Sequence, residues 1–183
     1  MNALIFDIDG VGLDEFKIIE GRWDIKGGSY RSIPRPTYTV LSGTGLHLYY
    51  VFEEPITLYP NIKTQLKSMK YDLTFVMWEY GETSKEETIQ YQSINQSFRM
   101  PGSYNCKEKE KKRVEAFRTG ERVTLDYLNQ YVVDPNNKVD MEKPFKSTEI
   151  TRKEAQEKYP EWYVRVVEPQ IERIIQMQLL RSV

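Results

Sequence analysis

The chain has 183 residues, 39% hydrophobic and 29% charged, which suits one folded domain with an appended helical piece. Lysine and arginine total 26 against 27 aspartates and glutamates, so no global positive charge indicates nucleic acid, and such a site needs local clustering. The single cysteine, Cys106, excludes a disulfide framework and a cysteine-based zinc site. No apolar stretch reaches the roughly 20 residues of a membrane span, and no signal peptide is visible, so we expect a cytoplasmic protein without membrane partners.

The first predicted element is a strand with the sequence ALIFDID. Its apolar residues Leu4, Phe6 and Ile8 alternate with a second face that ends in Asp7 and Asp9. Aspartates at positions i and i+2 project in parallel, and such oxygen ligands suit Mg²⁺ or Mn²⁺ together with the phosphates of a nucleotide. The structural alternative is a pair of solvated acids at the end of a strand.

Residues 10–36 are predicted to form a loop with one helical turn, and a β-hairpin follows from about Pro36 to Phe52. It turns at SGTG, where backbone N–H groups between glycines are open to phosphate oxygens. In the second strand, His47 and Tyr49 point away from the apolar side chains. His47 is the only histidine in the chain and can donate to the same phosphates, although a tight turn with a half-exposed histidine is the alternative.

Apolar residues recur at helical spacing from Pro60 to Trp78, which predicts a helix that covers the apolar side of a sheet. After a polar loop, SINQSFRMPGS is predicted to be a strand in which Phe98 and Met100 face the core. Arg99 then faces away from the core. It must pair with an acid or bind an anion, because an unpaired guanidinium there would be costly.

The remaining sequence predicts a short strand at VEAFR and a helix at TLDYLNQYV that is capped by Thr124. We therefore expect an α+β fold, with a mainly antiparallel sheet that carries helices on one face and leaves the other free for chemistry. The expected organisation is a sheet domain over residues 1–133, a linker over 134–147 and a helical C-terminal segment over 148–183. If the strands share one sheet, Asp7, Asp9, His47 and Arg99 converge on its open face.

The three polar motifs resemble those in the catalytic core of archaeo-eukaryotic-type primases. This primase-polymerase superfamily includes replication proteins of plasmids, phages and integrative elements. LIFDIDG resembles the DxD motif, VLSGTGLHLYYVF the SxGxGxH motif and INQSFRMPGSYN the RxPGS motif. The likeness spans roughly residues 3–133, and it implies an RRM-like sheet that forms the palm half of a primase-polymerase.

The resemblance also implies roles for individual residues. Asp7 and Asp9 would bind the catalytic Mg²⁺ or Mn²⁺. The triphosphate of the incoming nucleotide would be contacted by the hairpin residues and two basic residues, of which the lysine is the weaker match: Ser42, Gly43, Gly45, His47, Arg99 and Lys107.

Two departures from the family pattern stand out. Family members carry a third metal-binding acid shortly before the arginine, whereas this chain has Gln90, Gln92 and Asn95 there. They also place an α/β unit ahead of the DxD strand, whereas Met1 lies only a few residues before it, so we expect a truncated catalytic core.

The resemblance implies a DNA-dependent nucleotidyltransferase core, a primase or polymerase that acts in the replication of a mobile element. Its partners would be nucleoside triphosphates, a single-stranded DNA template, and a helicase or further replication domains. One alternative is a catalytically weak nucleotide- or DNA-binding module of a replication initiator. A second is a haloacid-dehalogenase-like phosphatase, since FDIDGVG also resembles that family's motif, with Asp7 as nucleophile and Asp9 as acid and base.

Overall fold

The computed structural model describes residues 1–25, 32–43, 45–78, 83, 89–106, 111–142, 157 and 160. Residues Met1–Glu142 form one compact unit, and Lys143–Val183 form a second. The predicted helical segment 148–183 lies outside the described residues, apart from Glu157 and Pro160. The elements of the first unit are, in order, β1 (Ala3–Asp9), α1 (Leu13–Gly21), β2 (Tyr38–Leu41), β3 (Gly45–Val51), α2 (Pro60–Trp78), β4 (Tyr104–Asn105), β5 (Lys112–Arg113), β6 (Glu115–Arg118), α3 (Leu125–Asn129) and the 3₁₀ helix η1 (Pro135–Asn137).

The fold is α+β with a four-stranded antiparallel sheet in the order β1-β3-β2-β6. Strands β4 and β5 form a separate two-stranded hairpin. The hairpin of β2 and β3, the helix α2 and the short strand β6 lie where the sequence pattern predicts them. Among the described strands, β1 lies at one edge of this sheet and pairs with β3 alone.

One face of the sheet is apolar and forms the core. Alternation along β1 and β3 directs every second side chain to this face, where helices α1, α2 and α3 supply the opposing residues. Phe6 and Tyr50 meet there edge to face, with ring centroids 5.5 Å apart. The core members from these strands are Leu4, Phe6, Ile8, Leu46, Leu48 and Tyr50.

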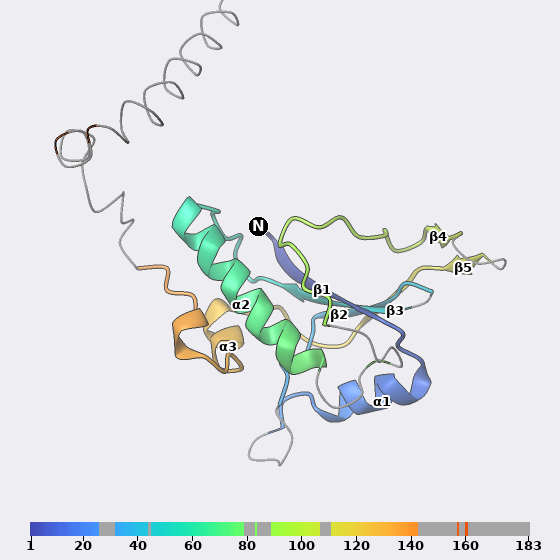
Figure 1. The fold of residues 1–183 in the computed structure, drawn as a ribbon. Helices are drawn as coiled ribbons and strands as arrows, with labels where there is room; N and C mark the ends of the chain where they lie inside the picture. Colours follow the sequence, from blue (N-terminus) through green and yellow to red (C-terminus); the bar gives the residue numbers. More distant parts are fainter. Residues whose placement is uncertain are drawn as a thin grey trace, which may run out of the picture. The chain divides into compact units, whose positions relative to one another are not determined.

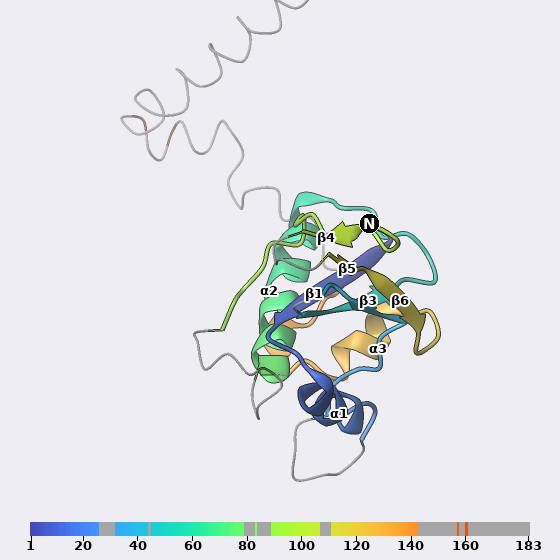
Figure 2. The same cartoon turned by 90° about the vertical axis from the view of Figure 1, so that its right-hand side faces the viewer.

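The second face of the sheet is covered in part by an irregular segment, residues 89–106. Helices α1 and α3 lie on one side of the sheet, and this segment with β4 lies on the other (Figures 1 and 2). The expectation that the second face stays open is therefore wrong for the part beneath this segment.

The predicted strand at SINQSFRMPGS is also wrong. Residues 89–103 contain no strand, and the first strand after α2 in the described part of the chain begins at Tyr104. Met100, which was expected to face the core, is largely exposed to solvent. The segment is held by side-chain contacts to β1 and α2 instead of a ladder of backbone hydrogen bonds, and such contacts leave no period-two pattern in the sequence.

The predicted loop between residues 10 and 36 contains a helix of nine residues, α1, which is longer than the expected single turn. Gly12 precedes the helix, and the side chain of Glu15 accepts a hydrogen bond from its backbone N–H at 2.9 Å. This contact satisfies one of the free donors at the start of the helix.

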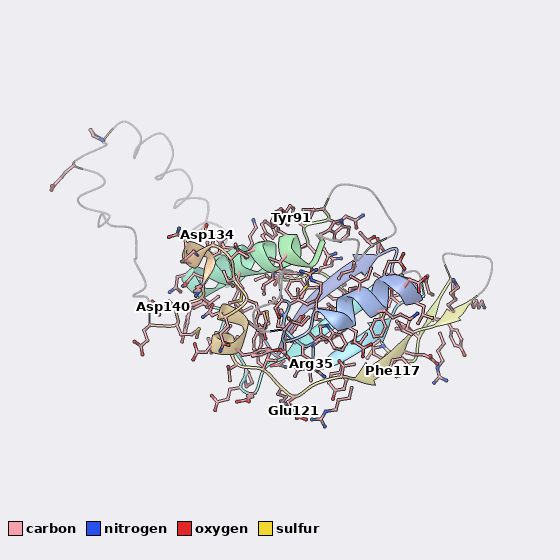
Figure 3. The ribbon with its side chains drawn as sticks, turned by 90° about the horizontal axis from the view of Figure 1, so that it is seen from below. Arg35, Tyr91, Phe117, Glu121, Asp134 and Asp140 are labelled. Carbon is pink, nitrogen blue, oxygen red and sulfur yellow. The ribbon has the colours of Figure 1, made fainter. Side chains whose placement is uncertain are left out.

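The compact unit extends to Glu142, beyond the expected boundary at residue 133. Asp72 in α2 accepts hydrogen bonds from the backbone N–H groups of Val133 and Asp134, and the Gln65 side chain accepts one from Asp140. Figure 3 shows Asp134 beside α2. Residues 134–142, expected to begin a linker, therefore pack on α2. Among the described helices, none is both long and apolar enough to cross a membrane.

Candidate functional site

Asp7 and His47 are cross-strand partners at the centre of the candidate site. The register of β1 and β3 sets Asp7 opposite His47 and Asp9 opposite Gly45. Residues directly opposite in an antiparallel pair share a face, so all three polar side chains lie on the face away from the core. The Nε2 atom of His47 is 3.4 Å from Oδ1 of Asp7.

His47 is buried, with only 2% of its surface exposed. The ring of Phe98 lies edge-on to the imidazole at a centroid distance of 5.3 Å, and Phe98 also contacts Tyr49 at 6.3 Å. The half-exposed histidine considered in the sequence is therefore not observed, because the segment 89–106 places an aromatic ring over it. Phe98 was expected in the helix-packed core and is found on the opposite face.

The environment of His47 disfavours its charged form. Burial, and next the positive charge of Arg99, lower the pKa of His47 to about 4, while the negative charge of Asp9 acts in the opposite direction. The imidazole is therefore neutral at pH 7. Its Nδ1 atom is buried and has no hydrogen-bond partner among the described residues. A buried nitrogen without a partner is costly.

Arg99 reaches this site from the irregular segment instead of a strand. Its side chain is half-buried, and its guanidinium is close enough to His47 to influence the pKa of the imidazole. The structure thus brings Asp7, Asp9, His47 and Arg99 into one neighbourhood from three separate parts of the chain. The register of β1 and β3 places Asp7, Asp9 and His47 on one face, whereas the parity argument for Arg99 does not apply, because this residue is not in a strand.

The glycine turn before β3 is held by its own serine. The Ser42 hydroxyl donates to the carbonyl of Gly45 at 3.0 Å, and the Ser42 backbone N–H donates to the same oxygen at 2.9 Å. Gly45 has to be glycine, because a Cβ at this position would lie 2.7 Å from the backbone oxygen of Ile8. The close approach of β1 to β3 next to Asp9 thus depends on the missing side chain.

The β4–β5 hairpin supports the same turn from outside. Asn105 in β4 donates from its side-chain amide to the carbonyl of Ser42 at 2.8 Å. Gly43 has a positive φ of 99°, and a Cβ there would lie 3.0 Å from the Asn105 amide nitrogen and 3.2 Å from Cβ of Lys112. Lys107, the weaker phosphate candidate, lies outside the described residues.

Lys70 is a part of this site that the sequence analysis missed. Its side chain is fully buried, its Nζ donates to the carbonyl of Ser93 at 2.9 Å, and the ammonium faces the rings of Phe6 and Phe98. Burial lowers the pKa of Lys70 to about 8, opposed by the negative charge of Asp7. Lys70 lies four residues after Leu66, on the apolar stripe of α2. A lysine at this position of the stripe indicates a buried charged side chain, and the sequence analysis could have used it.

Gln92 joins the irregular segment to the edge of the sheet. Its carboxamide oxygen accepts from the Asp7 backbone N–H at 3.0 Å, and its nitrogen donates to the Asp7 carbonyl at 2.7 Å. The side chain therefore takes the place of a neighbouring strand at this one position of β1. Gln92 lies where the resemblance implies a third acid, and here that position is used to hold the backbone of Asp7.

The donor set fits one divalent cation better than two. Among the described residues, no group of three or more histidine, cysteine, aspartate or glutamate side chains is arranged to hold a metal ion. Mg²⁺ commonly takes one or two carboxylates and completes its shell with water and substrate phosphates. Asp7 and Asp9 could supply such a pair, because both project from the same face of β1.

We compared the chain with protein-family models, with curated proteins and with solved structures, and none of the three comparisons gave a match. The likeness to primase-polymerases is therefore a likeness of motifs.

Proposed function

We propose that residues 1–142 form a nucleotide-binding nucleotidyltransferase core of the primase-polymerase type, acting on a single-stranded DNA template in mobile-element replication. The observation that carries this proposal is the convergence of Asp7, His47 and Arg99 from β1, β3 and the segment 89–106. The carboxylates of Asp7 and Asp9 are suited to a divalent cation, and the guanidinium of Arg99, whose charge acts on His47, is suited to a phosphate. We also propose that the four-stranded sheet is RRM-like, as in the palm half of a primase-polymerase.

In this proposal each residue has a positioning or electrostatic role. Asp7 and Asp9 would hold Mg²⁺ or Mn²⁺, which when bound neutralises phosphate charge and activates the attacking hydroxyl. Arg99 and His47 would orient the triphosphate beside the turn at Ser42 and Gly43. Phosphoryl chemistry of this kind depends on positioning and charge stabilisation.

The test measures nucleoside triphosphate binding by calorimetry, with and without Mn²⁺. The double variant Asp7→Asn/Asp9→Asn should lose the Mn²⁺-dependent binding, and Arg99→Gln should weaken binding by about 1.5–3 kcal/mol, because a charged hydrogen bond is removed. Asp14→Asn is the matched control, since the Asp14 side chain in α1 is almost fully exposed. Unchanged binding in the double variant would refute the proposed site.

Activity assays separate the alternatives. Primer synthesis on single-stranded DNA by the 183-residue chain supports a polymerase, whereas nucleotide binding without synthesis supports the binding module of a replication initiator. Hydrolysis of p-nitrophenyl phosphate that is lost in Asp7→Asn would favour the phosphatase alternative, in which Asp7 attacks phosphorus.

A further inference from the structure

A row of side chains crosses all four strands of the sheet on the same face as His47. Its member in β3 is Tyr49, two residues after His47. The register sets Ile5 of β1 opposite Tyr49 of β3, Tyr49 opposite Tyr38 of β2, and Tyr38 opposite Arg118 of β6. Cβ atoms of such neighbours are about 5 Å apart and share a face. Two tyrosines thus lie on adjacent strands, with an arginine beside them on the edge strand.

Exposure to solvent increases along this row away from the Asp7–His47 site. Tyr49 is half-buried beneath Phe98, whereas Tyr38 is 38% exposed and the Arg118 side chain is 60% exposed. The next row toward the glycine turn differs, because Val40, opposite His47, is buried. The exposed part of the row therefore begins beside the candidate site and consists of Tyr38 in β2 and Arg118 in β6.

We propose that Tyr38 and Arg118 bind single-stranded nucleic acid, with a base stacked on the Tyr38 ring and a phosphate paired with the Arg118 guanidinium. This inference rests on the proposed function, because it identifies where the strand served by the Asp7–His47 site lies. Exposed aromatic side chains on four-stranded sheets stack unpaired bases, and guanidinium groups match phosphate geometry.

Arg118 already has a partner, and that partner can be exchanged. Its guanidinium donates to the carboxylate of Glu121 and to the carbonyl of Gly120. The Glu121 contact is a surface ion pair between exposed side chains, which contributes little stability, so a phosphate can replace the carboxylate. The guanidinium is thus held at the end of β6 without being buried.

The chemistry favours single strands over duplexes. In a duplex the faces of the bases are covered by neighbouring bases, so a tyrosine ring has access only to unpaired nucleotides. The chain also has 26 basic against 27 acidic residues, so a general attraction to the duplex backbone is weak. Stacking on Tyr38, with one phosphate contact at Arg118, then contributes most of the binding free energy.

The experiment measures the fluorescence anisotropy of a labelled oligothymidylate with the full 183-residue chain, without nucleotide or divalent metal. Tyr38→Ala should weaken binding about tenfold or more, and Tyr38→Phe should retain it, because the ring remains. Arg118→Gln should reduce the dependence of log K on log salt by about one. Tyr59→Ala is the matched control: Tyr59 is 59% exposed and lies just before α2, and its removal should leave binding unchanged.

Equal affinity of Tyr38→Ala and the wild-type chain would overturn the inference, as would tighter binding to duplex or no binding to the single strand at low salt. If Tyr38→Ala does not fold, Arg118→Gln still tests the inference. The Arg118 side chain is exposed, so its replacement should leave the fold intact. Nucleotide binding measured separately distinguishes the two proposals. If the chain binds nucleotide but Tyr38→Ala binds the oligonucleotide as tightly as the wild type, only this inference is refuted. If oligonucleotide binding depends on Tyr38 but the chain does not bind nucleotide, only the proposed catalytic function is refuted.

Discussion

Two polar clusters in the first unit differ in how fully their hydrogen-bonding groups are satisfied. In the first, around Asp24, the carboxylate accepts from the hydroxyls of Tyr127 at 2.6 Å and Tyr131 at 2.7 Å, and from Nε of Arg35 at 3.1 Å. The Tyr127 hydroxyl also accepts from the backbone N–H of Arg35 at 2.7 Å. Burial alone would raise the pKa of Asp24, but these hydrogen bonds outweigh it and hold the pKa below its ordinary value.

The second cluster, around Asp7 and His47, keeps unused capacity. Nδ1 of His47 has no partner within the described part of the chain, and the buried Lys70 donates to a single carbonyl, that of Ser93. The pKa values of both basic groups are lowered by burial. A saturated cluster fixes a loop onto a helix, whereas an unsaturated buried cluster costs stability. This difference distinguishes the two clusters.

The largest expected effect is a pH dependence of the free energy of unfolding that comes from the Asp7–His47 cluster. Because His47 has a pKa of about 4 when folded and about 6.5 when unfolded, the unfolded chain binds more protons between these values. The free energy of unfolding should therefore fall by about 3 kcal/mol through this residue as the pH drops from 6.5 to 4. Urea unfolding at both pH values should show a smaller fall in His47→Gln.

NMR gives a direct check, since His47 is the only histidine. Its Cε1 proton should titrate with a midpoint near pH 4. A midpoint near 6.5 would show that the imidazole is not buried in solution. In Tyr127→Phe, which removes a hydrogen bond from Asp24 and leaves His47 untouched, the midpoint of the His47 titration should be the same as in the wild type.

A smaller effect is expected at Gln92, which holds the backbone of Asp7. Gln92→Glu removes the donor to the Asp7 carbonyl and places a carboxylate next to that oxygen, so it should lower the free energy of unfolding by about 2 kcal/mol. Gln90→Glu makes the same chemical change two residues away and should stay within about 0.5 kcal/mol of the wild type. Chemical denaturation measures both, and equal losses in the two variants would contradict the role assigned to Gln92.

The smallest expected effects lie in the saturated cluster. Tyr131→Phe removes one hydrogen bond to the partly exposed Asp24 and should cost about 1 kcal/mol. Tyr127→Phe should cost somewhat more, because its hydroxyl also accepts from Arg35. The order of the two urea midpoints is the test, and a larger loss in Tyr131→Phe would reverse the hierarchy inferred from the contacts.

The sequence pattern predicted those parts of the fold that depend on periodicity. Alternation in β1 and β3 predicted that Asp7 and His47 would lie opposite the apolar face, and the apolar stripe predicted α2 from Pro60 to Trp78. The hairpin followed from its glycine turn, and α3 followed from Thr124, whose hydroxyl accepts from the Tyr127 backbone N–H.

The sequence pattern failed where single side chains replace regular structure. Gln92 completes the edge of β1 with its carboxamide, and Phe98 covers His47 from an irregular segment. The sequence around these two residues has neither helical nor strand periodicity, so it cannot be distinguished from the sequence of an ordinary loop. Lys70 could have been noticed, because a charged residue on an apolar stripe requires a partner inside the protein. Its partner, the carbonyl of Ser93, carries no sequence information.

The carboxamide of Gln92 also occupies backbone groups at the edge of the sheet that another chain could otherwise pair with. An uncovered edge strand offers its N–H and C=O groups to any other extended chain, which leads to domain swapping and fibril formation. Gln92 occupies those groups at Asp7, and the Thr83 hydroxyl donates to the carbonyl of Asp9. At those two residues, both candidate metal ligands, the backbone groups already have side-chain partners, so intermolecular β-pairing is disfavoured there.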